Sequence, residues 1–201
     1  MKMQSQASNI EVCRGLPERY RRRAAEIYYE AFARKLGTIT GDRQHSVAIL
    51  EKAIEPGLVI AAFGSMDLAG LAGLQHEGRR FIQWKPAYFV QASGWLRGSL
   101  QALALSFDRQ PWREGQLLLD ALAVDATARG QGVGTLLLHA VFEFAREHGY
   151  RSVRLDVVDT NPDARRLYER LGFAPTQIHP YPYLRRWMGF SAATTMVKCL
   201  A

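Results

Sequence analysis

One stretch in the second half of the chain limits most strongly what it can fold into. A continuous apolar run, 116–124, leads into ARGQGVG (128–134), which places three glycines within five positions before an apolar, helix-forming segment. The alternating segment 152–158 follows, and then a helix that Asn161 would cap and Gly172 would close. Strand, loop, helix, strand and helix in this order predict two parallel strands joined by a right-handed crossover. We therefore expect an α/β or α+β fold with a mixed central sheet.

The rest of the chain adds further strands and two helices. Short apolar runs bounded by glycine, proline and polar residues predict strands at 10–15, 57–65, 68–77 and 190–200. Helices are predicted at 17–33 and 43–53, with a loop at 37–42 between them. Residues 79–115 hold one long helical pattern between charged, proline-containing segments, so we interpret them as a helical insertion. A chain of 201 residues with this pattern fits one domain over 1–201.

The longest apolar segment does not have the composition of a membrane helix. Residues 86–107 are long enough to span a bilayer, but Arg97 near their middle costs about 2.5–3.5 kcal/mol on insertion scales. No apolar signal segment opens the chain, and Cys13 and Cys199 lack the spacing of a zinc site or a disulfide framework. We expect a cytoplasmic protein that binds neither membrane nor metal. The net charge of +7 favours acidic partners, such as phosphorylated cofactors or nucleic acid.

The glycine loop matches neither of two familiar nucleotide-binding patterns. A dinucleotide fingerprint, G-x-G-x-x-G, would need glycine where the chain has Thr135. A P-loop would need the dipeptide Gly-Lys, which occurs nowhere in the sequence. The glycines still leave successive backbone N–H groups of residues 129–135 at a helix entrance, where the helix dipole favours an anion. This arrangement suits a pyrophosphate without a lysine.

The pattern that fits is Arg129-x-x-Gly132-x-Gly134, directly after a strand and at the start of a helix. It resembles the R/Q-x-x-G-x-G/A signature of the GCN5-related N-acetyltransferases (GNAT). The resemblance extends over about 116–177 and includes NPDARRLYERLGF (161–173), which is similar to the second diagnostic segment of that family. The N-terminal half matches only in the order of its elements. The resemblance implies a mixed, mostly antiparallel sheet flanked by helices, in which the two parallel strands splay apart.

The resemblance also implies that the pyrophosphate belongs to acetyl-CoA and that no metal takes part. The residues it implies for coenzyme binding are Leu122, Ala123, Val124, Arg129, Gly130, Gln131, Gly132, Val133, Gly134, Thr135 and Asn161. In relatives, a backbone N–H at the position of Val124 stabilises the oxyanion of the reaction. Asn161 is expected to contact the pantetheine arm, to cap its helix, or both.

Acetyl transfer from a thioester to an amine needs a base for the amine and a proton for the departing thiolate. An unperturbed alkyl amine has a pKa of about 10.4, so nearly every molecule is protonated at neutral pH. Asp120 interrupts the apolar strand and is the predicted base; the alternatives are a partnered acid at this position, Glu77, or a water chain. Tyr168 matches the tyrosine with which relatives protonate the thiolate, and the alternative is a core residue on an apolar helix face.

The sequence constrains the acceptor amine least. All four tryptophans lie in 79–115 or in the C-terminal segment 179–190, regions that wall the acceptor pocket in relatives. An aromatic acceptor pocket, a satellite hydrophobic cluster and a homodimer contact all fit this pattern. None of the five histidines has metal-ligand spacing, so none is assigned chemistry.

We predict an acetyl-CoA-dependent N-acetyltransferase that acts on a primary amine of a small molecule, by direct attack in a ternary complex. A protein or aminoacyl-tRNA acceptor is the first alternative, to which the positive charge gives slight support. A non-catalytic acyl-CoA-binding domain is the second. A nucleic-acid-binding module would interleave basic residues with exposed aromatics along one element, and only 181–187 approaches that pattern.

Overall fold

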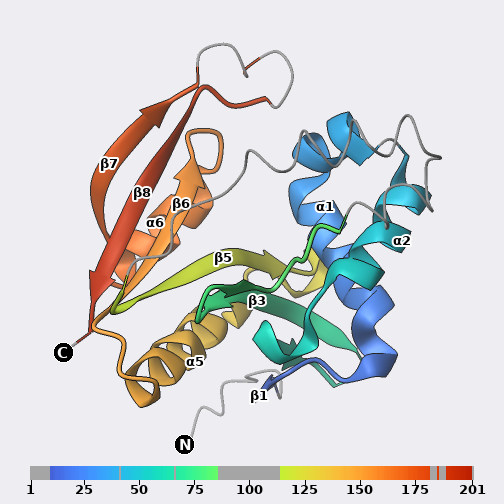
Figure 1. Cartoon of the computed structure of the whole chain (residues 1–201), viewed down its shortest axis with the longest axis horizontal. Helices are drawn as coiled ribbons and strands as arrows, with labels where there is room; N and C mark the ends of the chain where they lie inside the picture. The colour runs from blue at the N-terminus through green and yellow to red at the C-terminus, as the bar shows by residue number, and fades with distance from the viewer. Residues whose placement is uncertain are drawn as a thin grey trace, which may run out of the picture.

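The computed structural model describes residues 10–40, 42–65, 67–85, 114–181, 185 and 189–200. Their centre is a sheet of eight strands in the order β1-β2-β3-β5-β6-β8-β7, with β4 paired to β3 beside this path (Figure 1). The strands are β1 (Glu11–Arg14), β2 (Val59–Phe63), β3 (Leu68–His76), β4 (Arg79–Arg80), β5 (Gln116–Val124), β6 (Ser152–Val158), β7 (Ala174–Pro180) and β8 (Ala192–Cys199). Within these residues all paired strands run antiparallel except β5 and β6. The predicted mixed, mostly antiparallel sheet is confirmed.

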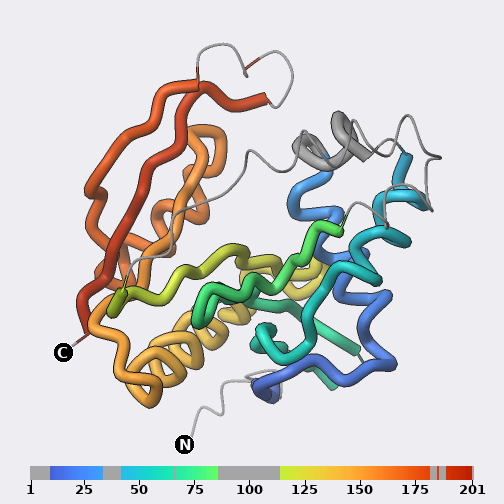
Figure 2. Tube along the Cα trace, viewed as in Figure 1, coloured from blue at the N-terminus to red at the C-terminus, as the bar shows by residue number. Residues whose placement is uncertain are grey.

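Helices cover both faces of this sheet. The α-helices within the described residues are α1 (Arg21–Thr40), α2 (Arg43–Ala53), α5 (Val133–Glu147) and α6 (Pro162–Arg170), and short 3-10 helices lie at Glu18–Tyr20, Pro56–Leu58 and Ala126–Ala128. Leu71 of β3 packs in one apolar cluster with α1 and α2, whereas Ala72 packs in a second cluster with α5 and α6. Because neighbouring strand residues point to opposite faces, the two helix pairs cover opposite faces. Figure 2 shows the β7–β8 hairpin on the opposite side of the molecule from α1 and α2.

α6 begins and ends where the sequence predicts. The Asn161 side chain accepts a hydrogen bond from the Ala164 N–H at 3.2 Å and so caps α6. Gly149 and Gly172, which follow α5 and α6, have φ angles of 71° and 86°. These left-handed conformations are those in which glycine commonly ends a helix.

β5 and β6 separate soon after they begin. Their pairing joins only 116–118 to 152–154, and beyond this point β6 continues along β8 while β5 continues along β3. The register between β3 and β5 shifts at Gly73, which leaves Asp120 as an extra residue in β5. A β-bulge of this kind bends its strand. The predicted splay of the parallel strands is therefore present, and we call the space between 119–124 of β5 and the outer part of β6 the fork.

β7 is a strand that the sequence analysis did not predict. Its residues, APTQIHP, are mostly exposed and include two prolines. It lies at the edge of the sheet, where one side of the strand needs no partner, and it pairs only with β8 within the described residues. Proline is tolerated at such an edge.

One predicted boundary was wrong, and the segment interpreted as an insertion begins with a short strand. The predicted loop at 37–42 is helical as far as Thr40. The helix α1 kinks at Phe32 (φ −122°, ψ 21°), but it continues beyond the kink. Residues 79–80, at the start of the segment interpreted as a helical insertion, form β4 against β3. The long helix predicted at 86–107 lies outside the described residues. No helix in the described part of the chain is long and apolar enough to cross a bilayer.

Candidate functional site

The glycine loop joins the end of β5 to the start of α5 (Figure 1). Gly130 and Gly132 have φ angles of 74° and 83°, in the left-handed region that other residues rarely adopt. A Cβ atom placed on either glycine would meet no other atom within 4 Å. The main chain therefore borders open space at both positions, and a ligand can approach it closely.

The first turn of α5 offers backbone donors to this open space. Gly132 caps the helix without a side-chain hydrogen bond, and the Leu136 N–H donates to the Gly132 carbonyl at 3.1 Å. The N–H groups of residues 133–135 precede this bond and so have no acceptor within the helix. The helix dipole adds a partial positive charge at the same end. Adjacent donors beside open glycines fit a diphosphate group.

Gly134 has a different role from the two glycines before it. A Cβ at this position would lie 3.1 Å from Leu167 Cδ2 in α6 and 3.9 Å from Val124 Cγ2 in β5. The absent side chain therefore lets the start of α5 pack closely against both elements. This contact keeps the donors of the helix entrance next to the fork.

Polar side chains within the segment between β5 and α5 hold it in shape. The Asp125 Oδ1 atom accepts hydrogen bonds from the Thr127 N–H, at 2.9 Å, and from the Thr127 hydroxyl. Gln131 Nε2 donates to the Thr127 carbonyl at 2.9 Å, and Arg129 Nε donates to the Val124 carbonyl at 3.3 Å. The sequence analysis missed Asp125, although aspartate two residues before threonine after a strand is a capping signal.

The backbone of Val124 faces the fork. The Asp125 N–H donates to the Ala69 carbonyl of β3 at 2.9 Å. Consecutive residues of a strand direct their backbone groups to opposite edges, so the N–H and carbonyl of Val124 point away from β3. The Arg129 hydrogen bond to that carbonyl agrees with this orientation. The expected oxyanion donor is thus placed at the edge of the fork, directly before the loop.

Two carboxylates flank the start of the fork. Asp120 lies in the bulge of β5, and Arg80 donates to both of its oxygens, at 2.6 and 3.0 Å. Asp156 lies two residues beyond the last β5-paired residue of β6 and accepts a hydrogen bond from the Thr195 hydroxyl at 2.5 Å. The sequence identified Asp120 as a candidate base but not its arginine partner, which is 40 positions away.

Tyr168 lies in α6 and is 7% exposed. Its ring packs edge-on against Phe173, with the ring centroids 5.8 Å apart, inside the cluster beneath α5 and α6. Burial raises the pKa of the Tyr168 phenol to about 12, so the hydroxyl keeps its proton far above neutral pH. The residue therefore combines a core position with a protonated hydroxyl.

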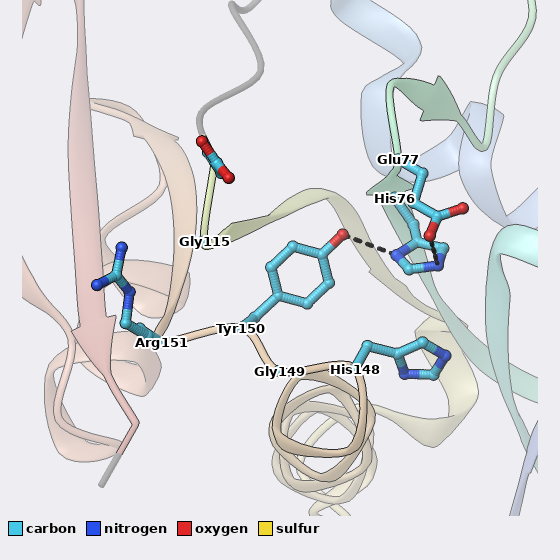
Figure 3. A pocket seen from close by; sticks show the side chains of 8 residues that line it. His76, Glu77, Gly115, His148, Gly149, Tyr150 and Arg151 are labelled. Atoms are coloured by element: carbon cyan, nitrogen blue, oxygen red, sulfur yellow. Dashed lines mark hydrogen bonds and ion pairs between the residues drawn. The ribbon is translucent and has the colours of Figure 1, made fainter.

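A hollow of about 360 Å³ lies at the other end of β5. It is lined by His76, Glu77, Glu114, Gly115, His148, Gly149, Tyr150 and Arg151 (Figure 3). The Tyr150 hydroxyl is 2.7 Å from His76 Nδ1, and burial lowers the pKa of His76. Because β3 runs antiparallel to β5, Glu77 at the end of β3 lies level with the start of β5. The structure thus places the alternative base Glu77 at the opposite end of β5 from Val124.

Most of the predicted acceptor wall falls outside the described residues, including Trp95, Trp112 and Trp187. Trp84 is described, and it packs against the cluster formed by α1 and α2. In the part of the chain that the structure describes, no three His, Cys, Asp or Glu side chains gather so as to hold a metal ion. Both cysteines are free thiols.

Comparison with known sequences shows which family the chain belongs to. The family model described as the acetyltransferase (GNAT) family matches residues 63–173, which is more than half of the chain. The chain belongs to the GNAT family. The match includes the fork, the glycine loop, α5 and α6, and it also includes the residues that line the hollow.

Curated relatives of this GNAT chain include N-acetyltransferase 8B of Homo sapiens, which is 42% identical over 73 residues. That alignment covers 36% of the chain and 32% of the relative. The Streptomyces lavendulae protein named streptothricin acetyltransferase is 31% identical over 140 residues, 68% of the chain and 66% of that relative. The chain spans 32% to 48% of the length of the first curated relatives that it matches.

Solved structures support the fold of this GNAT protein. The N-acetyltransferase from Staphylococcus aureus Mu50 superposes with a TM-score of 0.65 at 14% identity, over 94% of the chain and all of that structure. Ard1 from Thermoplasma volcanium superposes with a TM-score of 0.61 at 19% identity, over 96% of the chain and 98% of that structure. At these identities the likeness shows the arrangement of helices and strands.

Proposed function

We propose that this GNAT protein is an acetyl-CoA-dependent N-acetyltransferase, which acetylates a primary amine of a small molecule by direct attack in a ternary complex. One observation carries the proposal. Two open glycines lie at the donor-rich entrance of α5, beside a fork whose edge presents the Val124 N–H. Acetyl-CoA would supply the acetyl group as a thioester with a thiolate leaving group.

The loop and the start of α5 would bind the diphosphate of the coenzyme. The open backbone at Gly130 and Gly132 admits phosphate oxygens, and the N–H groups of residues 133–135 donate to them. The pantetheine arm would then enter the fork along 122–124 of β5. Asn161 uses its side-chain oxygen to cap α6, which leaves its amide NH₂ group to donate to the arm.

The Val124 N–H would stabilise the oxyanion that forms at the thioester carbonyl. This donor is preorganised because hydrogen bonds fix both sides of the residue, from Asp125 to β3 and from Arg129 to the Val124 carbonyl. A fixed donor needs no reorganisation during the reaction, and one such donor contributes about 10²–10³ in rate in other enzymes.

Asp120 is the proposed general base for the amine. Its carboxylate is held by Arg80 in one orientation, and its side chain is 12% exposed. Each Asp120 oxygen accepts one hydrogen bond from Arg80, and its second lone pair can accept one from the amine. The ion pair would thus orient the base as well as balance its charge.

Tyr168 is the proposed proton donor to the leaving thiolate. Its pKa of about 12 exceeds that of an ordinary thiol, about 8.5. Complete proton transfer from Tyr168 to an ordinary thiolate is therefore uphill. The hydroxyl therefore acts first as a hydrogen-bond donor that stabilises the developing thiolate, and transfers its proton as the products separate.

The small-molecule acceptor is supported by the relative that is named for acetyl transfer to streptothricin, whose match covers 68% of the chain. A protein or aminoacyl-tRNA acceptor and a non-catalytic acyl-CoA-binding domain are the competing functions. The intact glycine loop and the presence of Tyr168 favour catalysis over binding alone.

A screen of amines tests the function. The full chain is mixed with acetyl-CoA and a panel of polyamines, amino acids, aminoglycosides, peptides and aminoacyl-tRNA, and free thiol and acetylated product are measured together. We expect thiol release in step with acetylation of at least one small amine. Acetylation of peptides or aminoacyl-tRNA alone would move the assignment to a macromolecular acceptor. Coenzyme binding without release on any amine would support the non-catalytic alternative.

A further inference from the structure

We propose that Arg23 of α1 is a positioning residue for the coenzyme loop, because it holds the carboxylate that fixes the start of that loop. The inference rests on the proposed function, since it assumes that the loop binds coenzyme A. Arg23 lies on the opposite face of the sheet from α5, and it precedes the loop by more than 100 positions in sequence. Arg23 does not touch the proposed ligand site, so its effect on the coenzyme passes through Asp125.

The Arg23 guanidinium bridges two carboxylates from distant parts of the chain. Its Nε atom donates to Asp67 Oδ2 at 2.9 Å, and a terminal nitrogen donates to Asp125 Oδ2 at 2.5 Å. Asp67 in turn accepts a hydrogen bond from the Leu68 N–H at 2.7 Å, at the turn between β2 and β3. Arg23 therefore fastens α1 to the start of β3 and to the end of β5, which lie side by side in the sheet (Figure 1).

Asp125 depends on this arginine because it is buried. The residue is 6% exposed, and its hydrogen bonds divide between two tasks: Oδ1 holds Thr127, and Oδ2 holds Arg23. Hydrogen bonds from Thr127, and then the charge of Arg23, keep the pKa of Asp125 below its ordinary value. A buried carboxylate that loses its cation is strongly destabilised. Without Arg23, Asp125 would therefore move towards water or bind a proton.

Movement of Asp125 would reach the glycine loop through Thr127. The Thr127 N–H and hydroxyl are held by Asp125, and the Thr127 carbonyl accepts the hydrogen bond from Gln131. Gln131 lies directly before Gly132, the capping residue of α5. The chain of contacts thus runs from Arg23 through Asp125, Thr127 and Gln131 to the donors of the helix entrance. A displacement of about 1 Å at such a site can cost about 10²-fold in function.

A purely structural salt bridge predicts a different outcome from a positioning residue. A structural pair would lower the free energy of unfolding and leave the coenzyme affinity of the folded protein unchanged. A positioning residue lowers that affinity in molecules that remain folded. The measurement that separates them is therefore a titration of the folded variant with coenzyme A.

Neighbouring Arg22 provides a matched control. It is on the same turn of α1 and its side chain is 68% exposed, with Glu26 and Glu51 at 3.7 and 4.0 Å. Calorimetric titration with coenzyme A, at a temperature where thermal unfolding shows each variant to be folded, compares Arg23→Ala with Arg22→Ala. We expect the dissociation constant to rise at least about tenfold for Arg23→Ala and to change less than about twofold for Arg22→Ala.

Two further variants keep the test decisive if Arg23→Ala does not fold. Arg23→Lys retains the charge but cannot reach both carboxylates in the same way, so we expect this variant to bind coenzyme A more weakly than wild type. The double variant of Arg23→Lys and Asp125→Asn should lose less binding free energy for coenzyme A than the two single variants lose together. Both substitutions act through one contact, so their effects are not additive. Unchanged affinity in folded Arg23 variants overturns the inference alone. A wild-type protein that does not bind coenzyme A overturns the proposed function as well.

Discussion

Replacing Gly132 with glutamate separates the two roles of this residue, its backbone conformation and its place in the anion cradle. Gly132 has a φ of 83°, and a non-glycine residue there costs about 1–2 kcal/mol of folding free energy. A Cβ meets no atom within 4 Å, so no clash adds to this cost. A carboxylate at a helix N-terminus is favoured by the helix dipole, which lowers this folding cost by about 0.3–1 kcal/mol. The net cost is about 0–1.7 kcal/mol, so for a chain of this length the melting temperature should fall by at most about 7 °C.

The effect of Gly132→Glu on coenzyme binding is much larger. Two like charges about 4 Å apart near a protein surface repel by about 4 kcal/mol, which corresponds to nearly 10³ in the dissociation constant. The new carboxylate would also occupy the N–H groups of residues 133–135, which the diphosphate needs. Allowing for partial screening by salt, we expect coenzyme A to bind at least about 10²-fold more weakly.

Gly132→Ala and Gly132→Gln are the controls for this experiment. Alanine has the same backbone strain without charge or reach, and glutamine has the size of glutamate without its charge. Thermal unfolding should place the three variants within a few degrees of each other, while calorimetry should show affinity falling from alanine through glutamine to glutamate. Equal affinities of coenzyme A for the alanine and glutamate variants would refute the assignment of the loop as a diphosphate site.

The other residues of the proposed site allow equally specific measurements. Tyr168→Phe keeps the ring contact with Phe173 and should lower kcat by about 10²-fold without changing coenzyme affinity; an unchanged kcat across the pH range would remove the proton-donor role. Asp120→Asn should reduce kcat by about 10²–10⁴-fold with an unchanged dissociation constant for coenzyme A, and activity close to wild type would exclude Asp120 as the base. The lowered pKa of Asp125 means that the unfolded chain binds a proton first as pH falls. Its contribution to the free energy of unfolding is therefore complete above about pH 4 and lost at lower pH, and urea titrations from pH 3 to 7 should show a shallower acid decline for Asp125→Asn than for wild type.

Local patterns in the sequence were sufficient to predict the strand, loop and helix unit at the centre of the fold. Alternating and continuous apolar segments determine which residues form β5 and β6, since that pattern depends on near neighbours alone. The need for glycine at Gly130 and Gly132 is also local, because it follows from the backbone conformation of the loop. Asn161 before Pro162 predicted the start of α6 for the same reason.

The features that only the tertiary structure decided depend on contacts between distant residues. β7 has little apolar pattern of its own and exists because β8 provides a partner along one edge. Asp120 is read from sequence as a lone acid in an apolar strand, yet its environment is set by Arg80, 40 positions away. Arg23 is one of three consecutive arginines, and only the docking of α1 beside β5 distinguishes it from its neighbours. Which side chains meet across elements is fixed by packing and register, and no short stretch of sequence contains that information.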